Sequence, residues 1–216
     1  CLVSDVGRFN DKGFNQLQLP GLKHAAAKLG IKTKAVESHA AGDYIPNLSS
    51  CARAGYDLTI SAGFLLANQT ATVAKQYPNL SFAITDYSVA GPPFNGKATN
   101  VAGITYATQE NSYLVGCLAG LMVKKQGGRQ TIGVVGGVKI PPVDSFLAGY
   151  KTGAQQCNPG VTVLTGYSHA FLDQPNCKTV TQHPTPPGTH RQSNAPCPTA
   201  PRTPDAPHQP STRGHG

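Results

Sequence analysis

Short apolar runs alternate with longer amphipathic stretches through the first 174 residues of the chain. The apolar runs have the length of strands, and the longer stretches repeat apolar residues every three or four positions, as helices do. Gly30 and the turn at 158–160 supply helix stop signals, while Pro46 and Pro142 suit the first turn of a helix. The predicted strands are 1–4, 32–36, 57–61, 81–85, 101–106, 131–135 and 161–165, and the predicted helices are 14–29, 46–55, 65–76, 114–125 and 142–157.

The repeated strand–helix–strand order predicts an α/β fold, with a parallel sheet and helices on both of its faces. Ligands of such sheets bind beyond the carboxyl ends of the strands. We expect four polar or glycine-rich loops at that edge, which contain residues 5–16, 61–64, 86 and 136–142.

The clearest helical periodicity lies between residues 114 and 125. Gly116 and Gly120 on this helix would allow close packing against a neighbour. One face of the helix is apolar, which in a globular domain is the face that packs. Its members are Leu114, Cys117, Leu118, Leu121 and Met122. The first helix has a similar face, formed by Phe14, Leu17, Leu22, Ala25, Ala26 and Leu29.

Composition divides the chain near residue 175. Residues 175–216 contain ten of the 18 prolines and one Val, with no Ile, Leu, Met, Phe or Tyr. Such a segment cannot bury a hydrophobic core. It is either a disordered Pro-rich tail or an off-frame reading of the end of a gene, and the residues alone leave both open.

Charge and motif content exclude several classes of function. The net charge is +8, but the basic residues are scattered, without the basic stripe that nucleic-acid binding requires. The six cysteines have no zinc spacing, and we expect no metal and no cofactor. No GxSxG or HExxH motif is present, so we expect no enzyme. The apolar stretch at 113–123 is too short to span a bilayer.

The pairing of the cysteines cannot be read from their spacing. A disulfide between Cys157 and Cys177 is possible in an oxidising compartment. Cys117 lies in an apolar stretch, where we expect a buried thiol.

Two loops are candidates for ligand contact. In "DVGRFNDKGFNQ" (5–16), Asn10 and Asp11 either cap the following helix or present amide and carboxylate groups to a ligand. In "GVVGGVKIPP" (133–142), the glycines either form a tight strand-to-helix turn or approach a ligand. The second loop matches neither common phosphate-binding glycine motif.

Five ordered segments resemble the basic membrane protein family, whose members are substrate-binding lipoproteins of ABC transporters similar to the purine nucleoside receptor. They are "DVGRFNDKGFNQ", "GFLLANQTATVAKQYPNLSFAITDY", "NVAGITYATQENSYLVGCLAG", "IGVVGGVKIPPVDSFLAGYKTGAQQCNP" and "VTVLTGYSHAFLDQP". The resemblance implies a type I periplasmic-binding fold with two α/β lobes. Residues 1–106 would form the first lobe, 107–174 an incomplete second lobe, and 175–216 the tail.

The resemblance also implies a function. The chain would bind a nucleoside or similar small polar ligand, and lobe closure would be read by an ABC permease. The full-length protein would be an extracytoplasmic lipoprotein held at the cell membrane by a lipid anchor. A ligand sensor on the same fold is the alternative. The ligand-binding residues carried over by motif are Asn10, Asp11, Phe14, Asp86, Gly136, Gly137 and Phe171.

Three departures from the family pattern affect these expectations. Leu19 stands where the family has an aromatic residue, and Pro20 falls inside the first helix, which predicts a restart or a kink there. The match stops after Thr179, before the second lobe would be complete. We therefore expect this chain to bind ligand weakly or not at all.

Overall fold

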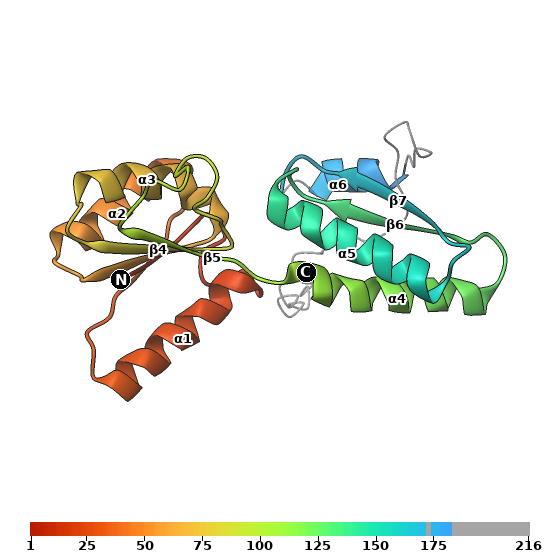
Figure 1. Cartoon of the computed structure of the whole chain (residues 1–216), viewed down its shortest axis with the longest axis horizontal. Coiled ribbons are helices and arrows are strands. Elements are labelled where there is room, and N and C mark those ends of the chain that lie inside the picture. Colours follow the sequence, from red (N-terminus) through yellow and green to blue (C-terminus); the bar gives the residue numbers. More distant parts are fainter. Residues whose placement is uncertain (172–173, 183–216) are drawn as a thin grey trace, which may run out of the picture. The chain divides into compact units, whose positions relative to one another are not determined.

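The computed structural model describes residues 1–171 and 174–182. The chain forms two compact units, one of residues 1–106 and one that begins at Ala107 (Figure 1). Each unit is built on a parallel sheet with helices packed against it, which confirms the predicted α/β class.

The first unit is a five-stranded sheet in the order β2–β1–β3–β4–β5. Helix α1 covers one face of this sheet, and α2 and α3 cover the other (Figure 1). The elements are β1 (Leu2–Ser4), α1 (Phe14–Leu29), β2 (Ala35–Val36), the 3₁₀ turn η1 (Ala41–Asp43), α2 (Tyr44–Arg53), β3 (Leu58–Ala62), the 3₁₀ turn η2 (Phe64–Leu66), α3 (Ala67–Gln76), β4 (Ser81–Thr85) and β5 (Val101–Ile104).

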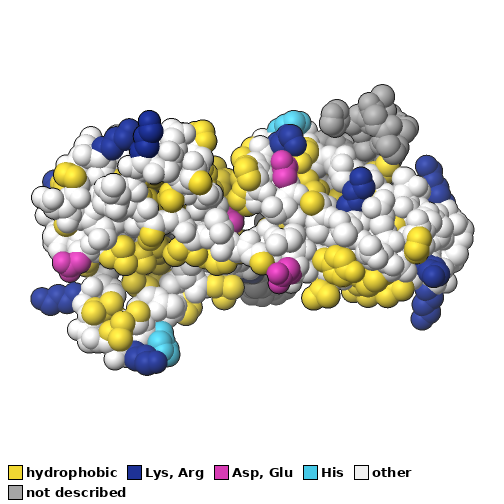
Figure 2. Space-filling view, in the orientation of Figure 1, with side chains coloured by type: hydrophobic (Ala, Val, Ile, Leu, Met, Phe, Trp, Pro, Cys, Tyr) yellow, Lys and Arg dark blue, Asp and Glu magenta, His cyan; other side chains and the backbone are white. Residues whose placement is uncertain are grey.

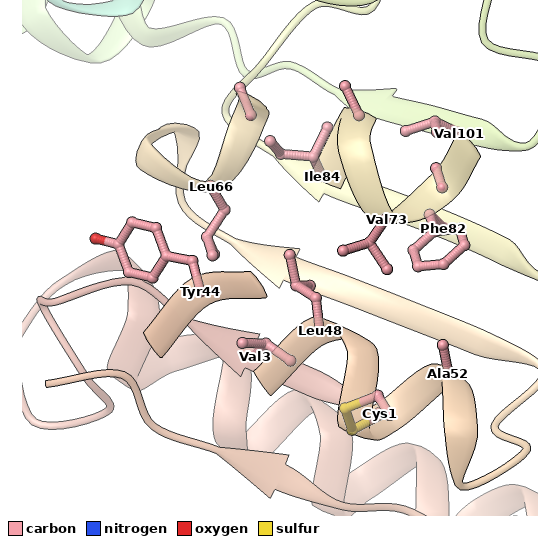
Figure 3. Close-up of a cluster of buried hydrophobic side chains, with 14 of the residues drawn as sticks. Cys1, Val3, Tyr44, Leu48, Ala52, Leu66, Val73, Phe82, Ile84 and Val101 are labelled. Carbon is pink, nitrogen blue, oxygen red and sulfur yellow. A yellow bond between two sulfur atoms is a disulfide. The ribbon is translucent and has the colours of Figure 1, made fainter. Parts of the chain in front are cut away.

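The main core of this unit lies between the sheet and helices α2 and α3 (Figure 3). Successive strand residues point to opposite faces. Val3 therefore faces this core, while Leu2 faces α1. Leu48 from α2 and Val73 from α3 are fully buried against Ile84 of β4.

Helix α1 packs less closely on its face of the sheet. Leu19 and Leu22 contact a small cluster there, while Phe14, Leu17 and Leu29 are 55%, 72% and 66% exposed. The predicted packing face of this helix is therefore wrong for those three residues. Of the two alternatives expected at Pro20, the restart is wrong, because α1 is continuous and Pro20 lies inside it, while the kink stays a prediction.

The second unit begins with α4 (Thr108–Gln126) and contains the two-stranded parallel sheet β6–β7. Helix α6 includes the first residues of the predicted Pro-rich tail, while 183–216 lie outside the described residues. No helix in 1–171 or 174–182 has both the length and the hydropathy to cross a bilayer. The remaining elements are β6 (Thr131–Gly136), α5 (Pro141–Cys157), β7 (Thr162–Tyr167) and α6 (Gln174–Gln182).

Helices α4 and α5 contact each other through glycines. A Cβ atom at Gly116 would lie 2.0 Å from the carbonyl oxygen of Tyr150, and one at Gly153 would lie 2.0 Å from that of Tyr113. The helix backbones thus meet at a separation that no larger residue permits. The close packing predicted for Gly116 is present, but the predicted apolar face of α4 is not buried: Leu114 is 68% exposed.

Each unit contains a disulfide. Cys1 is bonded to Cys51 of α2, and Cys117 of α4 is bonded to Cys157 of α5. The expectation of a free thiol at Cys117 is therefore wrong, as is the suggested Cys157–Cys177 pair. Helical periodicity placed Cys117 and Cys157 on separate helices, and only the packing of α4 on α5 brings their sulfur atoms together.

Candidate functional site

The loop between β1 and α1 is fixed by Asp11. Its Oδ1 atom accepts hydrogen bonds from the backbone N–H groups of Gly13 and Gln16, both at 2.9 Å, and Oδ2 accepts one from Asn15 at 3.1 Å. The first N–H groups of a helix have no intrahelical partner, so this carboxylate caps α1. The capping alternative for Asp11 is thus present in the structure, whereas Asn10 is exposed and its side chain bonds to none of the described residues.

A buried polar pair lies behind this loop at the end of β1. Asp5 is 7% exposed, and its Oδ1 atom accepts hydrogen bonds from Asn15 Nδ2 at 2.7 Å and from the Gly7 N–H at 2.9 Å. Burial raises the pKa of Asp5, while these two hydrogen bonds oppose the rise. A Cβ atom at Gly63 would lie 2.3 Å from Oδ2 of Asp5, so only glycine at the end of β3 leaves room for the carboxylate.

Asp86 follows β4 at the same carboxyl edge. Its backbone is left-handed, with φ of 58°, and burial raises the pKa of its carboxyl. Within the described part of the chain its side chain makes no hydrogen bond and no ion pair. A half-buried carboxylate without a partner is available to bind a donor from a ligand.

Two aromatic rings complete this edge of the first unit. The ring centroids of Phe14 and Tyr106 are 6.5 Å apart, with 31° between the ring planes. Both residues are about half exposed, at 55% and 46%. Burial and then the negative charge of Asp86 raise the pKa of the Tyr106 hydroxyl. Phe14, Asp86 and Tyr106 thus follow β1, β4 and β5 at one edge of the sheet, and of these three described residues only the two rings are in contact.

The second unit holds the remaining predicted residues at the carboxyl edge of its own sheet. Gly136 is the last residue of β6, and Gly137 follows it. A Cβ atom at Gly137 would lie 2.5 Å from Cδ1 of Phe171, so the missing side chain lets the Phe171 ring lie against the turn. Phe171 is 48% exposed. Of the two roles predicted for these glycines, the structure shows the tight turn, and the Phe171 ring forms an aromatic surface beside it.

A charged cluster stabilises the loop beside this turn. The Lys139 ammonium lies 3.3 Å from Oδ2 of Asp144 and 5.2 Å from the centre of the Tyr167 ring. The Tyr167 hydroxyl donates a hydrogen bond to Oδ1 of Asp144 and is the main cause of the lowered pKa of this carboxyl. Lys139 is therefore paired with Asp144 in the first turn of α5 and with Tyr167 at the end of β7.

Sequence reasoning missed the residues that support the site. Asp5, Asn15 and Gly63 form its buried polar base, and Tyr106 forms one of its rings. The position of Asp5 near the site could have been predicted, because this residue directly follows a predicted strand at the carboxyl edge of the sheet. The close approach of Asp5 to Gly63 depends on the pairing of β1 with β3, which no local pattern reveals. No three His, Cys, Asp or Glu side chains of the described segments lie close enough to hold a metal ion.

Comparison with known proteins assigns the family. Residues 1–183 match the family described as "ABC transporter substrate-binding protein PnrA-like". The chain is 31% identical over 184 residues to the ABC transporter nucleoside-binding protein BmpA of Lactococcus lactis, covering 83% of this chain and 50% of that protein. It is 31% identical over 167 residues to basic membrane protein A of Borreliella burgdorferi, covering 77% of this chain and 47% of that protein.

Solved structures agree with this assignment. A solute-binding protein of an ABC transporter system from Aeropyrum pernix superimposes with a TM-score of 0.68 at 30% identity, covering 82% of this chain and 50% of that one. A transcriptional activator of the comK gene from Bacillus halodurans has a TM-score of 0.57 at 18% identity, with 82% of this chain and 56% of that one covered, and shares the fold alone.

The chain spans about half the length of the relatives it matches. The family match nevertheless includes the whole first unit, the second unit as far as residue 183, and every loop described above. The chain belongs to the PnrA-like family of ABC transporter substrate-binding proteins.

Proposed function

We propose that the protein binds a purine nucleoside, or a small polar ligand like one, as the substrate-binding component of an ABC importer. The observation that carries this proposal is that a half-buried carboxylate without a partner among the described residues, Asp86, lies at the same carboxyl edge of the sheet as the exposed rings of Phe14 and Tyr106. A planar base with ribose hydroxyls needs both an aromatic surface and a hydrogen-bond acceptor.

The aromatic ring and the carboxylate of the site would make different contacts with the ligand. The Phe14 ring would stack on the base, an interaction worth about 1–3 kcal/mol per base. The Asp86 carboxylate would accept hydrogen bonds from sugar hydroxyls or from base N–H groups. Asp11 holds the start of α1, and therefore Phe14, in place. On the second unit, Gly137 and Phe171 supply another aromatic surface.

Location and partners follow from the same proposal. Relatives such as a lipoprotein of Pyrococcus furiosus, 33% identical over 179 residues, carry a lipoprotein name. Two disulfides in the described residues suit an oxidising compartment. We infer an extracytoplasmic protein that is anchored by lipid in its full-length form and delivers its ligand to a membrane permease.

Saturation-transfer NMR with millimolar adenosine, guanosine or inosine tests the ligand class, because this method detects weak binding. We expect a signal for the wild-type chain and an affinity weaker than submicromolar. Phe14→Ala and Asp86→Asn should each weaken binding about tenfold, which corresponds to about 1.4 kcal/mol. Leu29→Ala and Asp57→Asn are matched controls, because they alter exposed residues away from the site, Leu29 at the opposite end of α1 from Phe14, and should leave the affinity unchanged.

Two results would overturn the proposal. Absence of any nucleoside signal from a full-length version with a complete second lobe, as well as from this chain, would show that the ligand class is wrong. Equal loss of signal in the site variants and in the controls would show that Phe14 and Asp86 do not form the binding surface.

A further inference from the structure

The side chain of Gln18 connects helix α1 to the end of strand β4. Its Nε2 atom donates a hydrogen bond to Oγ1 of Thr85 at 3.2 Å. Gln18 lies four residues after Phe14, and residues four apart on a helix lie on the same face. Thr85 is the last residue of β4 and is followed directly by Asp86. The hydrogen bond therefore joins the part of α1 that carries Phe14 to the strand end that carries Asp86.

The Thr85 hydroxyl is a buried junction of three hydrogen bonds. Thr85 is 5% exposed, and its Oγ1 atom also accepts a hydrogen bond from the backbone N–H of Gly63 at 3.0 Å. Its own proton is directed to the carbonyl oxygen of Ser61, at 3.4 Å, or to Oε1 of Gln18, at 3.5 Å. A hydroxyl has one donor and two acceptor positions, so all of them are used when the Gln18 amide is bound. The ends of β3 and β4 thus fix the place of Gln18.

A second hydrogen bond attaches the first turn of α1 to the end of β1. Asn15, the residue after Phe14, is 4% exposed and donates to Oδ1 of Asp5 at 2.7 Å. The sheet order places β1 and β4 on either side of β3, so α1 is attached at two strands. Apolar packing adds little, because hydrophobic side chains of α1 lie at the surface (Figure 2). The two polar attachments therefore fix where the Phe14 ring lies at the carboxyl edge of the sheet.

We propose that Gln18 and Thr85 are positioning residues of the nucleoside site, which hold the Phe14 ring and the Asp86 carboxylate at a fixed separation. This inference rests on the proposed function, in which one ligand stacks on Phe14 and donates a hydrogen bond to Asp86. Such a ligand gains from both contacts only where the two groups are held at the separation that it spans. Because every residue of the arrangement lies within the compact first unit, this chain itself can be tested.

Saturation-transfer NMR with two ligands tests the positioning role. Adenosine can contact both Phe14 and Asp86, whereas caffeine is a purine with no N–H or O–H group to donate to Asp86 and can only stack. The signal that Phe14→Ala removes defines binding at this site for either ligand. In Gln18→Leu, the affinity for adenosine should fall about fivefold, as for one lost hydrogen bond, and the affinity for caffeine should not change. A merely structural role would weaken both ligands together.

A double-mutant cycle separates the Gln18–Thr85 pair from the other effects of each substitution. Gln18→Leu should weaken adenosine binding in the wild-type background but not in Thr85→Val, where its partner is absent. Thr59→Val is the matched control for Thr85→Val, because Thr59 is 1% exposed and its hydroxyl has no hydrogen-bond partner among the described residues. Gln76→Leu is the control for Gln18→Leu, because Gln76 is exposed at the end of α3. Both controls should bind adenosine as the wild type does.

Measurements on the free protein test the positioning without a ligand. Nuclear Overhauser effects between the rings of Phe14 and Tyr106, whose centroids are 6.5 Å apart, should weaken in Gln18→Leu and in Thr85→Val. Hydrogen exchange of the α1 amides should accelerate about fivefold in the same two variants, because each loses the attachment of the helix to β4. Thr59→Val should change neither measurement.

Three results would overturn the proposal. Equal loss of adenosine and caffeine affinity in Gln18→Leu would show that the substitution disrupts the stacking surface itself. Unchanged ring contacts in both variants would show that the pair does not position Phe14. Unchanged adenosine affinity in Gln18→Leu would overturn the inference while the proposed function stands. If the wild type binds no nucleoside and the ring contacts still weaken, the proposed function fails and the positioning of Phe14 by the pair stands.

Discussion

The Cys117–Cys157 disulfide gives a quantitative prediction for the stability of the second unit. Replacing both cysteines with serine removes the covalent link between α4 and α5 and leaves the glycine contacts of these helices in place. The link closes a segment in which the two cysteines are 40 residues apart. In the unfolded chain, a loop of about 40 residues restricts conformational entropy by about 4 kcal/mol at 25 °C.

The Cys1–Cys51 disulfide supplies the control. Its cysteines are 50 residues apart, which predicts a similar contribution to the first unit, larger by about 0.2 kcal/mol. Each double serine variant should therefore destabilise its own unit by about 4 kcal/mol and leave the other unit near its wild-type stability. The two variants thus serve as controls for each other.

Native-state hydrogen exchange measures the two units within one sample. The slowest amides of β6 and β7 report the opening of the second unit, and those of β3 and β4 report the first. In Cys117→Ser/Cys157→Ser, exchange in β6 and β7 should accelerate about a thousandfold, the equivalent of about 4 kcal/mol, while exchange in β3 and β4 should not change.

Two results would refute this reasoning. A change of less than tenfold in β6 and β7 would show that the link does not restrict the unfolded chain as the loop length implies. Equal acceleration in β3 and β4 would show that the two units do not unfold separately.

The other predictions concern helix packing and pH. Gly153→Ala should destabilise the second unit by about 1–3 kcal/mol, because its Cβ atom would lie 2.0 Å from the Tyr113 carbonyl oxygen. Gly21→Ala should instead stabilise α1 by about 0.5–1 kcal/mol, because nothing lies within 4 Å of a Cβ atom at this position. Urea titrations measure the free energy of unfolding of both variants, and equal effects would contradict the packing argument. Burial raises the pKa of Asp86, so the native state binds this proton more tightly than the unfolded state, and stability falls as pH rises between the two pKa values. Asp86→Asn should therefore unfold at a higher temperature than wild type at neutral pH and at the same temperature at low pH, and the reverse order would contradict the assignment.

Local patterns predicted the elements of this fold well and their contacts less well. The strand at 81–85 coincides with β4, and the helix predicted at 142–157 begins one residue earlier, at Pro141. Both depend on periodicity and stop signals that neighbouring residues supply. The repeated strand–helix order was enough to predict the parallel sheets.

Helix α4 shows why contacts are harder to predict. Its apolar periodicity indicates a buried face, but the helix packs through Gly116 and Gly120, which carry no hydrophobic signal. Close approach of two helix backbones stabilises the packing of the helices, and a hydropathy pattern gives no signal of such contact. Pro20 is a second case, since the helix continues through a residue whose local effect is to break it.

The candidate site also contains residues that the sequence predicts and a residue whose role the sequence leaves ambiguous. Asp86 and Phe14 followed from family motifs, and the structure places them at one edge of the sheet with Tyr106. Asp11 was ambiguous, because a helix cap and a ligand contact require the same residue type, and only its three backbone hydrogen bonds establish the cap. Whether Asn10 contacts a ligand stays a prediction.

The light packing of α1 has a consequence for how the first unit moves. Among its residues only Asn15 is buried, and Pro20 cannot donate the backbone hydrogen bond expected at its position. Elements with few buried contacts open at a lower free energy than the core they lie on. Helix α1 is thus held to the first unit mainly at its N-terminal end, by Asp11 and by the hydrogen bond between Asn15 and Asp5, and a ligand that stacks on Phe14 would also order the rest of the helix. Affinity at this site would then depend on residues such as Pro20 and Gly21, which lie beyond the reach of any ligand.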